Sequence, residues 1–131
     1  MSQENVEIVR RRFDAFNEGD LAAAFALTDP NFVWWDRADD PGAGVYRGQD
    51  AVEKHLAEIA EEIELQIEPL EFIEAGDAVV VPLRLSGRGL ASGVPFEAHE
   101  VHVFKLREGK VTEQREYRER SEALKAVGLE A

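Results

Sequence analysis

Asp36 is the residue of this sequence whose surroundings best suit acid–base chemistry. It follows an aromatic run, Phe32-Val33-Trp34-Trp35, which contains both tryptophans of the chain. Large apolar rings exclude water and disfavour the charged form of a carboxylate, so we predict a raised pKa for Asp36. A carboxylate of this kind can remove a proton from a carbon beside a carbonyl group. The alternative is structural: Asp36 ends a strand and accepts hydrogen bonds from loop amides.

His102 supplies the second group that such chemistry needs, because an imidazole can act as a general acid or base near neutral pH. Side chains alternate along a strand. Three of them therefore share a face of the first predicted strand: Phe32, Trp34 and Asp36. Three others share a face of a later strand: Glu100, His102 and Phe104. Only a strongly curved sheet would bring both faces to one cavity, with Asp36 and His102 as the catalytic pair. In the alternative, the imidazole only satisfies a buried carboxylate.

The composition limits the classes of function. A chain of 131 residues with 44% hydrophobic and 32% charged residues is typical of one globular domain, which we place at residues 1–131. The net charge of −12 argues against binding to nucleic acids or anionic membranes. The absence of cysteine excludes disulfides, thiol nucleophiles and thiolate metal sites. No apolar run approaches the roughly 20 residues of a membrane-spanning helix, so we expect a cytoplasmic protein.

Helices dominate the first half of the chain. Apolar residues recur at spacings of three and four at Val6, Val9, Phe13 and Phe16. Gly19 suits the end of this helix, and Asp20 suits the N-cap of a short second helix near 21–27. After the aromatic strand, a turn-rich loop at 37–44 precedes a third helix that begins near Gly48. One side of that helix carries Val52, His55, Leu56, Ile59 and Ile63.

From Glu64 onward the apolar period becomes two, which predicts strands. We place them at 64–68, 70–74, 78–88, 96–106 and 111–118. A closing helix follows with Ser121 as its N-cap, and Val127-Gly128-Leu129 predicts a Schellman stop. Helices first and antiparallel strands afterwards are typical of an α+β fold with one sheet covered by helices.

The strand at 78–88 has two unlike faces. One carries Val79, Val81, Leu83 and Leu85, and the other carries Val80, Pro82, Arg84 and Ser86. We group Val101 and Val103 of the following strand with the first, aliphatic face. By pattern alone this face packs on the helices, which leaves Arg84 and His102 in solvent.

Short segments form an ordered series along nearly the whole chain: Asn17–Asp20, Asp29–Phe32, Tyr46–Val52, Gly76-Asp77, Phe104–Val111 and Glu116-Tyr117. This series resembles the nuclear transport factor 2-like superfamily, and within it the SnoaL-like polyketide-cyclase group. The resemblance implies a cone-shaped fold, in which a curved antiparallel sheet wraps the N-terminal helices around a central pocket. It also implies a homodimer through the outer sheet face. On that reading the aliphatic face is the dimer interface, and Arg84 and His102 line the pocket.

The resemblance also implies roles for single residues. Asp36 is similar in position to the proton-shuttling aspartate of ketosteroid isomerases, and His102 to the acid of their oxyanion hole. Arg12 stands where those enzymes have a tyrosine, so steroid isomerase activity itself is not expected.

Arg84 and Glu116 resemble the arginine and one aspartate of limonene-epoxide hydrolases, but Ser86 replaces the second aspartate and breaks that catalytic set. Arg84 is then an anchor for a carbonyl or carboxylate, or a partner of Glu100 or Glu116. Glu116 also resembles the acid–base region of polyketide cyclases; if Tyr117 faces the pocket, Glu116 faces outward. The predicted substrate-binding residues are Trp34, Arg84, Glu100, Phe104 and Glu116.

His55 is expected to be structural and His99 to face outward. Because the histidines lack metal-ligand spacing, we expect neither a metal nor another cofactor. The sequence favours a protein that binds a small carbonyl-containing or cyclic molecule and, if it is an enzyme, transfers a proton during isomerisation, cyclisation or dehydration. The alternatives are a non-catalytic ligand-binding module and a dimer scaffold, because fold does not fix function.

Overall fold

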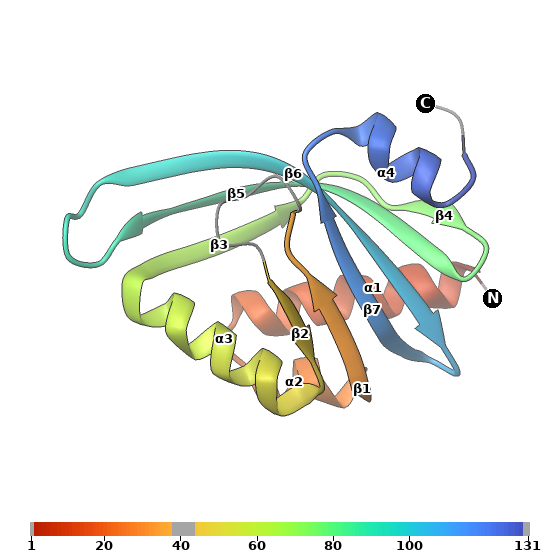
Figure 1. Ribbon diagram of the computed structural model, residues 1–131, viewed down its shortest axis with the longest axis horizontal. Coiled ribbons are helices and arrows are strands. Elements are labelled where there is room, and N and C mark those ends of the chain that lie inside the picture. Colours follow the sequence, from red (N-terminus) through yellow and green to blue (C-terminus); the bar gives the residue numbers. More distant parts are fainter. Residues whose placement is uncertain (1, 38–43, 130–131) are drawn as a thin grey trace.

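The computed structural model describes residues 2–37 and 44–129, which form four helices and seven strands (Figure 1). The helices are α1 (Ser2–Asn17), α2 (Leu21–Ala26), α3 (Gln49–Glu62) and α4 (Arg120–Ala126). The strands are β1 (Thr28–Trp35), β2 (Val45–Arg47), β3 (Ile63–Pro69), β4 (Ile73–Ala75), β5 (Ala78–Gly89), β6 (Pro95–Arg107) and β7 (Lys110–Tyr117). The predicted α+β class is confirmed. Most of the predicted loop at 37–44 lies outside the described residues.

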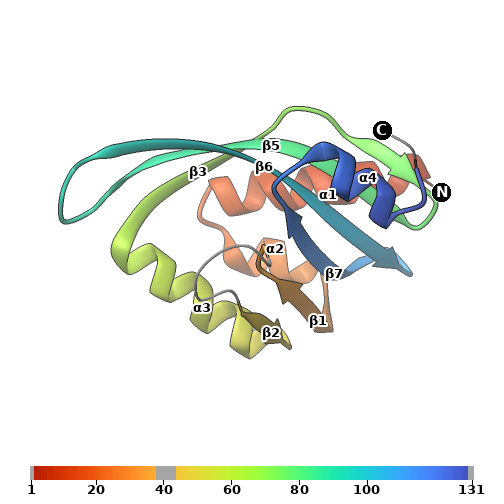
Figure 2. The same cartoon turned by 45° about the horizontal axis from the view of Figure 1, so that its top comes forward.

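The strands form one curved sheet that does not close on itself. Their order is β2-β1-β7-β6-β5-β3, and β4 pairs with β5. β1 and β7 run parallel, whereas the other neighbours are antiparallel. Figures 1 and 2 show α1, α2 and α3 on one side of the sheet and α4 on the other. The inner, concave face therefore encloses three helices, as the cone-shaped fold requires. No helix in the described ranges is long and apolar enough to cross a membrane.

The main core lies between α1 and the inner face of the sheet. Val9 and Phe13 of α1 are buried against strand residues that include Phe32, Val81 and Phe104. The rings of Phe13 and Phe104 meet edge to face, with 5.4 Å between their centroids. This contact fixes α1 against β6, which carries three of the predicted site residues, Glu100, His102 and Phe104.

The pairing of β5 with β6 corrects the predicted faces. Val81 lies opposite His102, and Leu83 lies opposite Glu100. Since cross-strand partners share a face, the aliphatic side of β5 faces inward together with His102. The prediction that grouped Val101 and Val103 with that side is wrong.

Most of the residues predicted to form the dimer interface are instead buried inside the protein. Val79, Val81 and Leu83 are fully buried in the main core. On the outer face, Val101 and Val103 are buried with Val80 beneath Ala123 and Leu124 of α4. The aliphatic set is therefore split between two cores within one chain, and it does not form an exposed patch.

The ends of the helices follow local signals. Gly19 has a φ of 78°, and Asp20 Oδ1 accepts a hydrogen bond from the Ala23 amide at 3.0 Å, as predicted. The C-terminus of α4 is a Schellman stop, in which the Leu129 amide donates to the Leu124 carbonyl at 2.8 Å. Its N-cap is Glu119 in a capping box with Glu122. The prediction of Ser121 is wrong, because the helix begins earlier, at Arg120.

Candidate functional site

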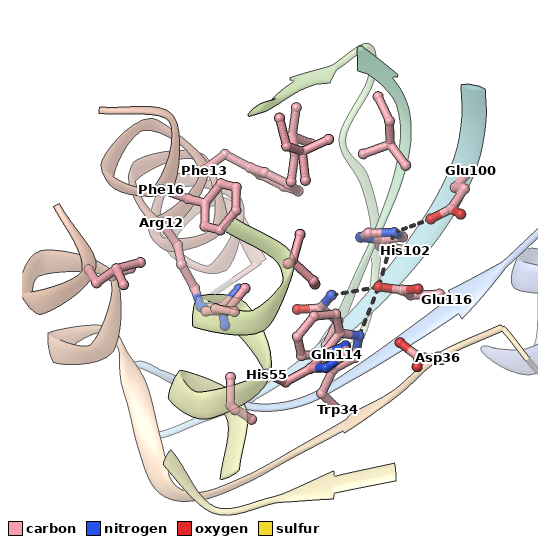
Figure 3. A pocket seen from close by; sticks show the side chains of 18 of the residues that line it. Arg12, Phe13, Phe16, Trp34, Asp36, His55, Glu100, His102, Gln114 and Glu116 are labelled. Atoms are coloured by element: carbon pink, nitrogen blue, oxygen red, sulfur yellow. Dashed lines mark hydrogen bonds and ion pairs between the residues drawn. The ribbon is translucent and has the colours of Figure 1, made fainter. Parts of the chain in front are cut away.

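A cavity of about 380 Å³ lies between the three inner helices and the concave face of the sheet. Most of its lining is apolar and comes from α1, α2, α3 and β3. Its polar lining residues are Arg12, Asp36, His55, Glu100, His102, Gln114 and Glu116. Figure 3 shows His102, Glu116, Gln114 and Trp34 grouped on one side of the view, with Arg12 on the other. The cavity thus has two separate polar ends.

His102 is the buried centre of the larger polar end. Its side chain is only 5% exposed, and its Nε2 lies 3.0 Å from Glu100 Oε1. The same nitrogen lies 3.6 Å from Glu116 Oε2. The β6–β7 ladder causes this arrangement, because it sets Glu116 directly opposite His102. An imidazole between two carboxylates can hold or exchange a proton with either of them.

Glu116 is a nearly buried carboxylate with a raised pKa. Desolvation by burial is the main cause, and the charges of Glu100 and Asp36 act in the same direction. His102 and a hydrogen bond from Trp34 oppose the shift. The Trp34 indole nitrogen donates to Glu116 Oε2 at 2.8 Å, and the Gln114 amide donates to the same oxygen at 3.2 Å. Glu116 therefore takes up a proton at a higher pH than an ordinary glutamate.

Asp36 lines the cavity beyond the end of β1. Its Oδ2 accepts hydrogen bonds from the Gly44 amide at 3.2 Å and from the Tyr46 hydroxyl at 3.4 Å. Burial and the nearby Asp36 raise the pKa of Tyr46. The Tyr46 ring stacks on His55 with 3.9 Å between centroids. Asp36 thus takes part in local hydrogen bonds, as the structural alternative expects, while it also borders the cavity.

Three ligand atoms at this end are close enough to share a cation. One atom each from Glu100, His102 and Glu116 lies within 4.8 Å of the others. Nitrogen and carboxylate donors suit several divalent metals. The expectation of no metal rested on the spacing of the histidines and did not consider these two carboxylates.

Six of the seven predicted site residues line the cavity: Trp34, Asp36, Glu100, His102, Phe104 and Glu116. Arg84 does not, so its predicted place in the pocket is wrong. It lies on the outer face, where its Nε is 3.0 Å from Glu68 Oε1 and its Nη1 is 2.8 Å from Glu97 Oε1. Its strand parity is opposite to that of Val81, which faces inward. The choice between Glu116 and Tyr117 falls to Glu116, because Tyr117 lies opposite the outward-facing Val101.

Three polar lining residues were not predicted as site residues: Arg12, His55 and Gln114. Gln114 lies two positions before Glu116 on the same strand, so strand parity alone places both on one face. His55 was assigned a structural role on the apolar side of α3. Arg12 lies one turn before Phe16 on α1, and this helical spacing is the signal that could have placed it in the cavity.

Comparisons with known proteins agree with this fold. Residues 9–114 match the SnoaL-like domain. No curated protein matches the sequence of this chain. An NTF2-like protein from Burkholderia xenovorans is 32% identical, with a TM-score of 0.77 and 98% of each chain covered.

Two further structures are similar. A SnoaL-like polyketide cyclase candidate from Jannaschia sp. has 25% identity and a TM-score of 0.76, with 88% of this chain and 85% of the other covered. A protein of ketosteroid isomerase-like fold from Catenulispora acidiphila, solved with trimethylamine, has 21% identity and a TM-score of 0.75, with 94% and 93% covered. The family match covers residues 9–114, which is most of the sequence. The chain therefore belongs to the SnoaL-like domain family.

Proposed function

We propose that this protein binds a small carbonyl-containing molecule in the cavity and transfers a proton on it without a cofactor, as an isomerase, cyclase or dehydratase. Apolar cavities of a few hundred Å³ with a few convergent polar groups are typical of small-molecule sites. The similarity to a polyketide cyclase candidate is in keeping with chemistry beside a carbonyl.

The observation that carries the proposal is the pair of Glu116 and His102 in the cavity wall. Burial raises the pKa of Glu116, which makes its carboxylate a stronger base than one in water. His102 Nε2 lies 3.6 Å away and is held from the other side by Glu100. An acid–base group of adjusted pKa beside a second proton carrier is the arrangement that general acid–base catalysis needs.

The proposed reaction has two proton transfers. The ionised Glu116 removes a proton from the carbon beside the substrate carbonyl, and the electron pair moves onto the carbonyl oxygen. His102 donates a hydrogen bond to that enolate oxygen and so stabilises its charge. Glu116 then returns its proton to a carbon, or to a leaving hydroxyl group in a dehydration. The removal and the return together leave the cluster with the number of protons with which it began.

Asp36 is the second candidate for the base, as the sequence predicted. Its carboxylate already accepts hydrogen bonds from Gly44 and Tyr46, which favours a positioning role. We therefore assign the proton transfer to Glu116 and the positioning of Gly44 and Tyr46 to Asp36.

Deuterium uptake tests the proposal without knowledge of the natural substrate. The probes are levulinate and 2-pentanone in D₂O, with loss of the hydrogens beside the ketone followed by proton NMR. The protein should accelerate exchange, and Glu116→Gln should lower the rate roughly 100-fold or more. Glu113→Gln is the matched control, because Glu113 lies on the same strand with its side chain on the opposite face, where it pairs with Arg115. Equal rates in Glu116→Gln and the wild type contradict the proposal.

Thermal unfolding separates loss of function from loss of fold. A raised Glu116 pKa means that the folded state binds this proton more tightly than the unfolded state. The contribution of Glu116 to the free energy of unfolding is therefore fully present below its ordinary pKa of 4.5. It is lost as the pH rises toward the raised pKa of the folded state. Above the raised pKa, the cost of burying the charged Glu116 carboxylate remains. Glu116→Gln removes it, so its Tm at pH 7 should be no lower than that of the wild type.

A non-catalytic binding protein is the second candidate function. The contacts of His102 favour it, because the two flanking carboxylates already satisfy one nitrogen of a buried imidazole. Binding of the two probes with no acceleration of deuterium exchange supports this second function and contradicts the first.

A further inference from the structure

Arg12 is a half-buried cation in the cavity wall that the proposed proton transfer does not use. It projects from α1 and lines the cavity, and Figure 3 shows it apart from the cluster around His102 and Glu116. The side chain keeps part of its surface accessible although it lies among buried residues. Burial lowers the pKa of Arg12 to about 10.

The contacts of Arg12 leave its charge without a counterion among residues 2–37 and 44–129. Its Nε donates to Thr28 Oγ1 at 2.9 Å, and the Thr28 hydroxyl in turn donates to the Ala24 carbonyl. The guanidinium carbon lies 5.0 Å from the ring centre of Phe32 and 5.7 Å from that of Phe104. In the described part of the chain no carboxylate forms an ion pair with it. The rings offer a favourable but weak substitute for an anion.

This situation is unusual in a chain so rich in acids. The sequence has 27 aspartates and glutamates against 15 lysines and arginines. Exposed arginines obtain partners readily: Arg88 with Glu64, and Arg120 with Glu71. A buried charge normally has a hydrogen-bonded partner, because desolvation is costly otherwise. A guanidinium has five N–H donors, and Thr28 occupies one of them.

We infer that Arg12 is the anion subsite of the cavity and that the substrate is a small organic carboxylate. The carboxylate lies against Arg12, and the reacting carbon lies near Glu116 and His102. The first half of this inference concerns binding alone; the second half rests on the proposed function.

A monocarboxylate fits the two ends better than a more highly charged anion. The planar guanidinium matches the two oxygens of a carboxylate. The opposite end of the cavity carries Asp36, Glu100 and Glu116, which would repel a second negative charge. The volume of about 380 Å³ admits a small aromatic or aliphatic acid.

The test compares benzoate with its neutral isostere benzamide, titrated into the protein at pH 7.5 and followed by NMR. Benzoate should bind more tightly than benzamide by roughly tenfold or more. Arg12→Gln should remove this preference and leave the affinity for benzamide almost unchanged. Arg11→Gln is the matched control, because Arg11 is the exposed neighbour on α1 and carries the same charge. It should keep the preference.

Several results would overturn the inference. One is equal affinity of the wild type for the two probes. Another is a preference that survives Arg12→Gln or that is lost to the same extent in Arg11→Gln, since the latter would reflect net charge alone. If Arg12→Gln does not fold, the Nε–H resonance of Arg12 in the wild type decides: benzoate should shift it and benzamide should not.

The two proposals can fail separately. Benzoate preference in a protein that exchanges no deuterium retains the anion subsite and contradicts the proton transfer. If 2-pentanone exchanges as fast as levulinate and the protein does not prefer benzoate, the proton transfer is retained and the anion subsite is contradicted. Glu116→Gln should keep the preference for benzoate, because it changes only the opposite end of the cavity.

Discussion

Trp34 donates its indole N–H to Glu116 Oε2 at 2.8 Å, which ties the aromatic strand β1 to the acid on β7. The two strands are parallel neighbours, and Trp34 pairs with Gln114, two residues before Glu116. This hydrogen bond stabilises the ionised carboxylate and lowers its pKa, whereas burial raises it by more. The aromatic strand therefore both desolvates the acid and limits the effect of that desolvation.

Trp34→Phe should move the acid limb of the pH–rate profile to higher pH. The substitution keeps an apolar ring and removes only the donor to Glu116, so the pKa of Glu116 rises further. The measurement is the rate of deuterium exchange against pH. Trp35→Phe is the control, because the Trp35 side chain lies on the outer face. The guanidinium carbon of Arg115 lies 3.8 Å from the centre of the Trp35 ring. An unchanged profile in Trp34→Phe would mean that Glu116 is not the titrating base.

His102→Asn and Asp36→Asn separate the roles of the two residues predicted to be catalytic. His102→Asn should lower exchange roughly 100-fold, since it removes the proton donor. Asp36→Asn should lower it less than tenfold, because Asp36 holds Gly44 and Tyr46 and does not take the substrate proton. Both should retain the fold by circular dichroism. A larger loss in Asp36→Asn than in Glu116→Gln would instead make Asp36 the base.

Removal of divalent cations should leave the activity unchanged. The proposed proton transfer uses only Glu116 and His102, so dialysis against EDTA should not alter the rate of deuterium exchange. The contradictory outcome is a loss of activity that Mg²⁺, Mn²⁺ or Zn²⁺ restores. In that case the donors of Glu100, His102 and Glu116 hold a metal.

The homodimer stays a prediction with a different basis from the one in the sequence. The outer face beyond α4 carries charges, among them Arg84, Arg88 and Glu97, rather than the aliphatic set. A dimer through this face should weaken as salt is added, because exposed charges are screened. Light scattering at micromolar concentration in low and high salt is the measurement. A monomer in both conditions contradicts the prediction.

Local patterns predicted most of the fold. The α1 stripe, the turn at Gly19 and the change to period two at Glu64 each depend on neighbours in sequence, and each lies where it was expected. The face shared by Glu100, His102 and Phe104 was also correct, since alternation along one strand is local. The predictions gave six of the residues that line the cavity.

The relation between strands could not be read in the same way. Whether Val81 lies beside His102 or beside Val101 depends on the β5–β6 register, and a shift of one residue reverses every side chain. The sequence pattern joined the two most similar faces, which kept Arg84 and His102 on one side of the sheet. The resemblance then placed both in the pocket, and only His102 lies there. Two features depend on contacts between residues far apart in the sequence: the hydrogen bond between Trp34 and Glu116, and the lack of an acidic partner for Arg12 in the described residues. Local patterns could not predict them.

The most direct test of the central claim is the titration of Glu116 in the free protein. Carbon-13 NMR of the glutamate side-chain carboxyls follows it, and the signal absent from Glu116→Gln identifies the residue. We predict a midpoint above the ordinary value of 4.5, because burial disfavours the charge. A midpoint at or below 4.5 would show that the ionised form is well stabilised, and Glu116 would then be a structural acceptor for Trp34 rather than the base of a proton transfer.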